Sequence, residues 1–238
     1  MAEIADKWGL DEISVPKRQK LFRALFAEFL GIFILNLFGC LSATCGDPAV
    51  ISITFGLEVF MIISVLGHVS GSHINPAVTV GFVVSGQMPV VRAILYILVQ
   101  CLGAVAGTAG LKVFLHESHH GLLCHLYLDP SITVLHGVLI EFFLTFLLML
   151  AVLAVSDENK SESKITGALT VGLVVVLGNL SAIKYTGASM NPARYFGSAF
   201  IAQSWENHWV YWVGPLMGAI AASLVYMPLF KAPKLKIG

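Results

Sequence analysis

The chain has 238 residues, of which 57% are hydrophobic and only 12% charged, and its formal net charge at pH 7 is zero. Because soluble domains carry about a quarter charged residues, this composition indicates a chain that lies within a lipid bilayer. Without a surplus of basic residues there is no electrostatic field to gather nucleic acid, so nucleic-acid binding is not supported.

Residues 1–20 are largely polar and charged, which is atypical of a signal peptide and predicts a cytoplasmic N-terminal tail. Six apolar runs follow, each about 20 residues long and therefore able to cross about 30 Å of hydrocarbon. They cover residues 21–42, 49–69, 91–115, 132–155, 165–184 and 208–230. Two shorter apolar pieces, 75–84 and 191–201, are about half a membrane thick and predict re-entrant half-helices.

Two parts of the chain repeat each other. AEFLGIF from Ala27 corresponds to IEFFLTF from Ile140, and GSHINPAVTVGF around Asn75 corresponds to GASMNPARYFGS around Asn191. Three spans separate the copies, and an odd number of spans inverts the second copy in the membrane. The expected fold is therefore an all-α membrane protein with six transmembrane helices and two re-entrant half-helices, arranged as an inverted repeat.

The first repeat is expected over 21–115, with its half-helix at 75–84, and the second over 132–230, with its half-helix at 191–201. Because the half-helices are inverted copies, we expect them to meet head to head near the middle of the membrane, where a pore belongs.

Lysine and arginine are unevenly distributed between the predicted loops, and cytoplasmic loops are typically enriched in both. With both termini inside, eleven basic residues fall on the cytoplasmic side and only Lys112, Lys184 and Arg194 in the outer half. This orientation makes 116–131 an extracellular connecting loop and 231–238 a cytoplasmic C-terminal tail.

Each half-helix begins with the same triplet, Asn75-Pro76-Ala77 in the first repeat and Asn191-Pro192-Ala193 in the second. Proline loses nothing in a first helical turn, and asparagine before it is a favoured N-cap. Unwound backbone ahead of each triplet is tolerated only if it is buried or lines a water-filled cavity. The two N-termini, each with about +0.5 charge, should disfavour a cation or hydronium ion between them. The two asparagine amides can donate to a passing water and so interrupt a proton wire.

The paired triplets, together with GHVSGSHINPAV, YTG, NPAR, FGSA and NHWVYWVGP, resemble the aquaporin family of major intrinsic proteins over 27–229. The resemblance implies the aquaporin fold, a passive water channel that excludes protons and ions, and a pore in each protomer of a homotetramer. It further implies a multi-pass protein of the plasma membrane with water and lipid as its partners. We expect no cofactor, and no enzyme motif of the GxSxG, HExxH or P-loop type occurs in the sequence.

By this resemblance four residues form the selectivity filter: Phe55, Asn179, Ala188 and Arg194. The guanidinium of Arg194 is permanently charged, offers donors to water and repels cations. Strictly water-selective relatives carry histidine in place of Asn179 and often cysteine in place of Ala188. We therefore expect a wider filter, with no other cysteine in it.

The range of solutes is left open by the sequence. A filter without histidine resembles that of a group of insect aquaporins that pass glycerol. Three other positions instead match the water-channel pattern: Ala199, Tyr211 and Trp212. Permeability to glycerol or urea, as in an aquaglyceroporin, is the alternative to a strict water channel.

Four further ionisable residues lie near the predicted pore. Glu28 and Glu141 occur one per repeat inside apolar runs, where a carboxylate is costly unless it is satisfied. The resemblance assigns them to holding the re-entrant loops through backbone N–H groups, with a proton relay as the alternative. Glu58 is interpreted as a hydrogen-bonded carboxyl between helices, or else as a pore-lining charge. His73 either lines the inner pore or is a plain hydrogen-bonded histidine.

No metal site is predicted. The four cysteines have neither CxxC nor CxxH spacing. Four histidines crowd the 116–131 loop in a spacing typical of neither a zinc finger nor a helical pair: His116, His119, His120 and His125. An alternating-access transporter and a junctional protein without useful flux remain competing interpretations of the fold. Inverted repeats also occur in transporters, but no ion-coupling carboxylate cluster with a substrate cage is visible.

Overall fold

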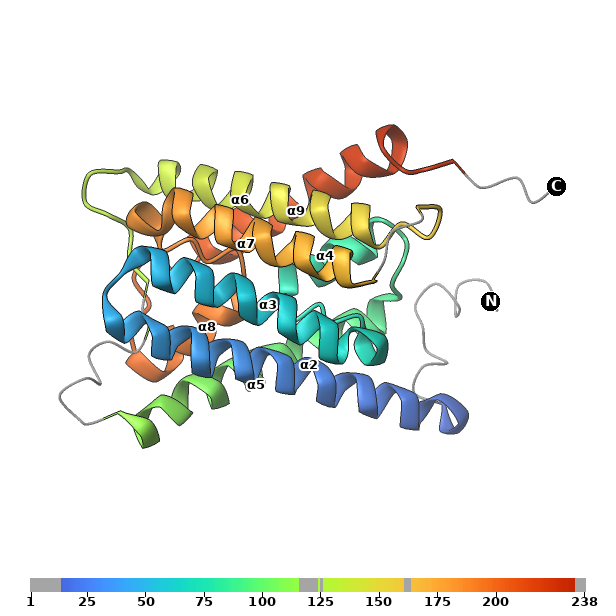
Figure 1. Ribbon diagram of the computed structural model, residues 1–238, viewed down its shortest axis with the longest axis horizontal. Coiled ribbons are helices and arrows are strands. Elements are labelled where there is room, and N and C mark those ends of the chain that lie inside the picture. Colours follow the sequence, from blue (N-terminus) through green and yellow to red (C-terminus); the bar gives the residue numbers. More distant parts are fainter. Residues whose placement is uncertain (1–13, 116–123, 125, 161–163, 234–238) are drawn as a thin grey trace.

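The computed structural model describes residues 14–115, 124, 126–160 and 164–233, and the four loop histidines named above lie outside these ranges. Within the described part six helices are long and apolar enough to cross a membrane (Figure 1). They are α2 (Val15–Ser42), α3 (Pro48–Ser70), α5 (Val90–Phe114), α6 (Val134–Val155), α7 (Lys164–Thr186) and α9 (Val210–Leu229). The described residues also form two short helices, α4 (Pro76–Val84) and α8 (Pro192–Ala202), and a 3₁₀ turn, η2 (Ala43–Cys45). The expected fold class is confirmed.

Local sequence signals set several of the helix ends. Asp47 caps α3 by accepting a hydrogen bond from the Ala49 N–H at 2.8 Å, and Pro48 occupies the first turn, where a missing N–H costs nothing. Gly71 ends the same helix with φ of 92°, a left-handed conformation that glycine adopts without steric cost. Between such ends the helices are apolar on nearly every face, as expected of spans that contact both lipid and protein.

Small residues let the helices of each repeat approach closely. Gly107 of α5 lies against the Phe33 carbonyl of α2, and Gly218 of α9 lies against the Phe142 carbonyl of α6. A Cβ atom at either glycine would collide with backbone, so any larger residue would push the two helices apart. Within each half, one pair of helices therefore packs closely: α2 with α5 and α6 with α9. The two halves meet where α3 packs against α7.

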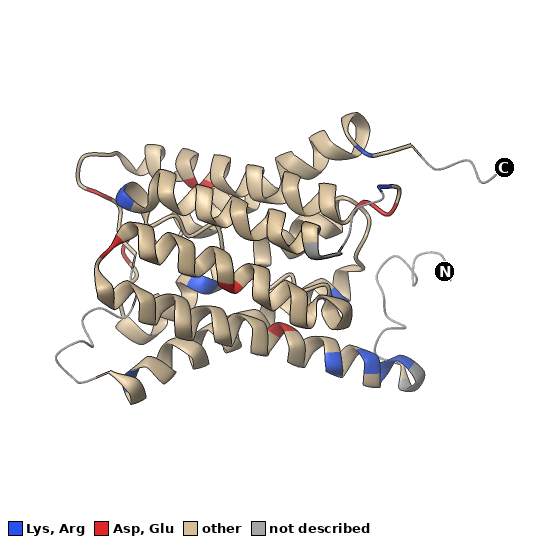
Figure 2. Cartoon of the chain, viewed as in Figure 1, with Lys and Arg blue, Asp and Glu red and all other residues tan. Residues whose placement is uncertain are grey.

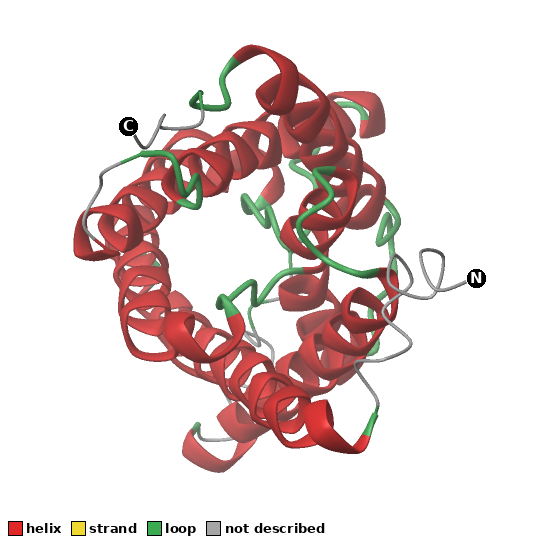
Figure 3. Cartoon of the chain, turned by 90° about the vertical axis from the view of Figure 1, so that its right-hand side faces the viewer, coloured by secondary structure: helices red, strands yellow, loops and turns green. Residues whose placement is uncertain are grey.

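The two short helices enter the bundle from opposite ends (Figure 1). The first turn of α2 and the last turn of α9 lie at one end of the molecule, which we call the tail end. Helix α4 lies on this side and α8 toward the other, the far end (Figure 1). Seen along the bundle, the helices form a ring and loops enter its centre (Figure 3). The N-terminal turns of α2 place a group of Lys and Arg residues at the tail end (Figure 2).

Candidate pore and its constriction

A cavity of about 700 Å³ lies between the two halves and is lined by residues of both repeats. At the tail end its wall includes His68 near the end of α3 and Ser156 after α6. Both asparagines of the triplets line it, and its wall toward the far end includes Arg194. The cavity therefore connects the tail end to the region of the expected filter.

The loops that precede the short helices adopt one unusual backbone conformation twice. Gly71 and Gly187 have φ of 92° and 77°, and the residues one and three positions later also have positive φ in each loop. In the first loop these include Ile74, at φ of 43°, a conformation that is a genuine outlier for a β-branched residue. Residues 71–74 and 188–190 line the cavity, so this strained backbone is at the wall of the candidate pore.

Two buried carboxylates hold the strained loops. Glu28 accepts hydrogen bonds from the backbone N–H groups of His73 and Ile74 at 2.9 and 2.6 Å. Glu141 does the same for Ser189 and Met190 at 2.9 and 2.8 Å. Both glutamates are fully buried, and each also accepts from a hydroxyl at the end of the preceding helix. The two carboxylates therefore supply hydrogen-bond acceptors to loop N–H groups that are buried at this depth.

The N-termini of α4 and α8 meet through their capping asparagines. Asn75 Oδ1 accepts from the Ala77 N–H at 2.8 Å, and Asn191 Oδ1 accepts from the Ala193 N–H at 3.1 Å. Each amide also crosses to the other loop: Asn75 Nδ2 donates to the Met190 carbonyl, and Asn191 Nδ2 donates to the Ile74 carbonyl, both at 2.8 Å. Since an amide nitrogen carries two N–H groups, each asparagine keeps one donor for the cavity.

The four expected filter residues come from three helices and from the loop before α8, and all line the cavity. Arg194, in the first turn of α8, lies with its guanidinium carbon 4.8 Å from the centre of the Phe55 ring. Asn179 of α7 is buried and uses one N–H to donate to the Val175 carbonyl at 3.0 Å. Ala188 contributes only a methyl group to the wall.

Comparisons with known proteins agree with this geometry. The family model "Major intrinsic protein" matches residues 16–226. The chain belongs to the major intrinsic protein family. Human aquaporin-4 is 40% identical over 221 residues, which cover 89% of this chain and 68% of that protein. Human aquaporin-2 is 44% identical over 209 residues, which cover 86% of this chain and 77% of the relative.

The crystal structure of the aquaglyceroporin from Plasmodium falciparum superposes with a TM-score of 0.79 at 27% identity, covering 88% of this chain and 96% of that one. Membership of the major intrinsic protein family and the six apolar helices make this chain an integral, multi-pass membrane protein. The resemblance inferred from the triplets is confirmed.

One cysteine lies closer to the filter than the sequence reasoning expected, although it does not line the cavity. Cys124, in the segment that follows α5, lies beside the filter: Arg194 Nη2 is 3.1 Å from its Sγ, and the cysteine is buried. The sequence led us to expect no other cysteine there, because loop residues far from the triplet carry no periodic signal of their location. The segment is brought to the pore by contacts with α8, since Tyr195 donates its hydroxyl to the Leu126 carbonyl at 3.1 Å.

Asn36 is a second residue that the sequence reasoning missed. Its side chain is fully buried in α2 and donates to Thr108 at 2.9 Å and to the backbone carbonyl of Arg194 at 3.0 Å. A lone amide within an apolar run was the available signal, because a polar group at membrane depth is costly unless it is paired. Asn36 thus ties α2 to the first turn of α8.

Glu58 fits neither of its two interpretations. Both carboxyl oxygens are buried without a hydrogen-bond partner among the described residues, and Glu58 is absent from the cavity wall. Its nearest surroundings include Gly39, at which an added Cβ would lie 2.8 Å from the carboxyl. His73, in contrast, lines the cavity and also places Nδ1 at 3.2 Å from the Thr79 hydroxyl, with its ring stacked on Phe82.

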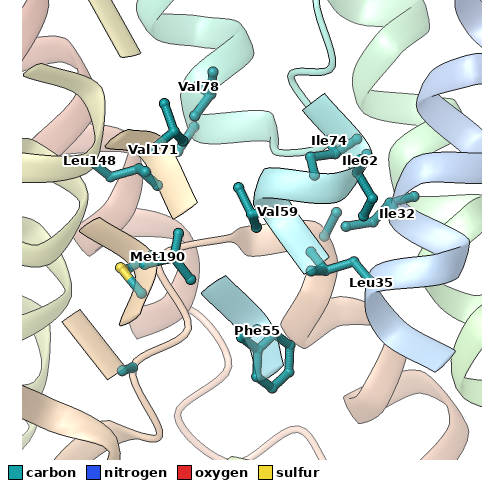
Figure 4. Close-up of a cluster of buried hydrophobic side chains, with 14 of the residues drawn as sticks. Ile32, Leu35, Phe55, Val59, Ile62, Ile74, Val78, Leu148, Val171 and Met190 are labelled. Atoms are coloured by element: carbon teal, nitrogen blue, oxygen red, sulfur yellow. The ribbon is translucent and has the colours of Figure 1, made fainter. Parts of the chain in front are cut away.

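Much of the remaining wall is apolar and comes from both repeats (Figure 4). The side chains that Figure 4 labels and that also line the cavity are Leu35, Phe55, Val59, Ile74, Val78, Leu148, Val171 and Met190. A wall of this kind offers few groups that could bind a solute tightly.

Proposed function

We propose that this protein is a passive water channel that excludes ions and protons. The observation that carries the proposal is that one cavity is lined by both asparagine caps and by Arg194. Its relatives named above are aquaporins, and family membership makes the chain a passive channel rather than an enzyme.

The asparagine caps supply the central barrier to cations. Two helix N-termini face each other there, and each carries about +0.5 charge on its unpaired N–H groups. The spare N–H of Asn75 and of Asn191 donates to the oxygen of a passing water, which turns that water's hydrogens away from its neighbours. A proton is thereby denied a continuous chain of water molecules, while water itself still passes.

Phe55, Asn179, Ala188 and Arg194 form the selectivity filter in this proposal. The guanidinium repels cations and donates to water, and its Nη1 has no hydrogen-bond partner among the described residues, which leaves a donor for permeating molecules. The Phe55 ring keeps the opposite wall apolar. His73 lines the inner half of the pore, and Glu28 and Glu141 support the loops rather than relay protons, because their oxygens are occupied by loop N–H groups.

Glycerol is the second solute that the geometry favours. Asn179 and Ala188 are small, and a small wall beside the Phe55 ring has room for the carbon side of a polyol. The structural likeness to a protein described as an aquaglyceroporin is consistent with this breadth. Permeability to urea, a small planar and polar solute, is a second measure of the width of the filter.

For the cellular setting we propose a homotetramer in the plasma membrane, surrounded by lipid, with both termini cytoplasmic. The Lys and Arg residues at the tail end support that orientation (Figure 2), because cytoplasmic ends of spans are enriched in basic residues. Many large apolar side chains are exposed on the outer faces of the long helices, for example Phe22, Leu98, Phe143 and Leu224, and lipid or neighbouring protomers would cover them.

Stopped-flow light scattering on proteoliposomes tests the proposal directly. Vesicles that contain the protein should shrink faster in sucrose than protein-free vesicles of the same lipid, and should then reswell when glycerol is the osmolyte. Shrinkage at the protein-free rate would contradict the water channel. A saturable flux that depends on an ion gradient would favour the transporter instead.

A further inference from the structure

Two free thiols meet beside the filter. Cys40 of α2 is fully buried and Cys124 is 7% exposed, and the two thiols interact within one cluster of buried side chains. Cys124 is in turn the hydrogen-bond partner of the Arg194 guanidinium. Neither cysteine lines the cavity, so the proposed water path does not use them.

The contact between the thiols is held from both sides. Cys40 lies near the end of a long, well-packed helix, whereas the segment that carries Cys124 is fastened to the second repeat. Besides the Tyr195 contact described above, the Asp129 N–H donates to the Tyr185 carbonyl at 2.8 Å. Cys124 itself has φ of 57°, an unusual conformation for a residue other than glycine, which these neighbouring contacts hold in place. The pairing of the two thiols is therefore built into the packing of the far end.

The surroundings make Cys124 the more reactive thiol. The neighbouring Cys40 thiol and the positive charge of Arg194 lower the pKa of Cys124 below the usual range of a thiol, against the opposing effect of burial. A lowered pKa raises the fraction of thiolate, which is the form that attacks an oxidant. Cys40 is adjacent to Cys124, so its thiol is placed to react with Cys124 once that residue has been oxidised.

We propose that Cys40 and Cys124 are an oxidative modification site at which a small hydroperoxide forms a reversible disulfide beside Arg194. In the first step the Cys124 thiolate attacks the peroxide oxygen, the O–O bond breaks, and with one proton the products are Cys124 sulfenic acid and an alcohol, or water when the oxidant is hydrogen peroxide. In the second step the Cys40 sulfur attacks the sulfenic sulfur, the S–O bond breaks, and the Cys40 proton leaves with the hydroxyl as water. The two cysteines lose two electrons in total, and the peroxide gains them.

The bond would act on the filter through Arg194. A disulfide sulfur carries no negative charge, so Arg194 loses its charge-assisted partner. The guanidinium, whose Nη1 has no hydrogen-bond partner among the described residues, is then free to turn into the cavity that Arg194 lines, where it narrows the path. Oxidation should therefore lower water flow, an effect that rests on the proposed function, whereas formation of the bond does not.

The test uses full-length protein with Cys45→Ser and Cys101→Ser, which removes the other two cysteines and leaves only the pair. Proteoliposomes are treated with hydrogen peroxide, alkylated, digested without reductant and analysed by mass spectrometry. We expect a cross-linked peptide pair containing Cys40 and Cys124 that separates on addition of dithiothreitol. Adding Cys40→Ala to this background should abolish the cross-link and leave a Cys124 sulfenic acid that dimedone traps. Absence of the cross-link, or a bond between the Cys124 residues of two protomers, would overturn the proposal.

Water flow in the same vesicles, relative to each variant before treatment, measures the consequence. It should fall when the pair is oxidised and recover with dithiothreitol, and it should not respond to peroxide in a Cys124→Ala variant, which has no sulfur beside Arg194 to oxidise. A cross-link with unchanged flow would overturn the effect on Arg194. Absence of water flow before treatment would instead contradict the proposed function and leave the cross-link result standing on its own.

Discussion

The two ends of the cavity are related by the internal repeat, yet they differ in chemistry. Three pairs of wall residues are each separated by 116 positions, as Asn75 and Asn191 are: Phe55 and Val171, Ile63 and Asn179, and Val78 and Arg194. The far-end members include an amide and a guanidinium, whereas their counterparts toward the tail end are all aliphatic. The polar residues of the constriction therefore lie at one end of the cavity, although the loops and half-helices that build it occur in both repeats.

The framework itself is closely repeated. Each loop has a glycine with positive φ, a glutamate that accepts from two successive N–H groups, and an asparagine that crosses to the other loop. These features satisfy backbone groups at membrane depth, a requirement that both copies share. Selectivity is not such a requirement, so one copy is sufficient to supply it.

The largest expected effect comes from breaking the shared framework. In Glu141→Gln, the amide nitrogen cannot accept from the loop N–H groups, so at least one buried donor loses its partner. The loss should lower the free energy of unfolding by at least about 2 kcal/mol, because an unsatisfied buried group costs about 1 to 3 kcal/mol in addition to a lost charged hydrogen bond. The thermal midpoint of the detergent-solubilised protein measures it, and Glu28→Gln should behave alike.

Glu58→Gln is the matched control for this prediction. It makes the same substitution at a buried carboxyl that has no hydrogen-bond partner among the described residues, so it should leave the midpoint unchanged or raise it. Equal destabilisation by the Glu58 and Glu141 variants would mean that the loop contacts are not what stabilises the fold.

The next effect comes from making the far end resemble the tail end. Arg194→Val places at the filter the residue found at position 78, removing a charge and a donor. Two unit charges about 4 Å apart repel by ~4 kcal/mol at a dielectric constant near 20, so proton leak should rise by at least about tenfold while water flow stays high. A pH-sensitive dye inside the vesicles reports the leak. Val78→Ala changes the corresponding position without changing charge and should leave proton leak low; an unaltered leak in Arg194→Val would remove the arginine from the barrier.

Features set by local chemistry were the ones that could be predicted from the sequence. Asn75 and Asn191 cap helices because the following proline and the N-cap preference act within a few residues. The position of Cys124 could not be predicted, because it depends on how its loop packs against Tyr195, a contact between residues far apart in the chain. The missing partner of Glu58 is a property of its three-dimensional surroundings as well, and periodicity along α3 does not reveal it.

A narrower filter at the far end should increase the selectivity for water over glycerol. Asn179→His restores the bulkier residue of strictly water-selective relatives, and glycerol permeability should fall at least about tenfold, since one such change in a pocket alters discrimination by ~1 to 3 kcal/mol. Water flow should fall much less. Light scattering with glycerol, normalised to water flow, measures the ratio, and Ser181→Ala on the exposed face of the same helix is the control. If the unmodified protein already excludes glycerol as fully as the histidine variant does, the filter is not wide.

The smallest expected effect lies at the tail end, where a loop rather than a constriction borders the cavity. Asp157 accepts hydrogen bonds from the Ala232 N–H at 2.8 Å and from the Tyr226 hydroxyl at 3.1 Å, and its neighbours Ser156 and Glu158 line the cavity. These contacts, that with the Ala232 N–H foremost, hold the pKa of Asp157 below its usual range. Hydrogen bonds thus connect the loop after α6 to the C-terminal segment at any pH at which Asp157 is ionised.

Because the pKa is lowered, the stabilisation by these hydrogen bonds is fully present above the ordinary aspartate pKa of about 3.9. It is lost as the pH falls through the lower pKa of the folded state. Acidification from neutral pH to about pH 5 should therefore leave it intact. Asp157→Asn should speed deuterium exchange at the Ala232 amide by about two- to fivefold, the factor that ~0.5 to 1 kcal/mol gives for an exposed charged contact. Glu158→Gln, one residue away, should not change that rate. The ratio of exchange rates between Asp157→Asn and the unmodified protein should stay constant down to about pH 5 and approach unity only in stronger acid; a ratio that already falls between neutral pH and that point would show that Asp157 is not the group that fastens the inner loop.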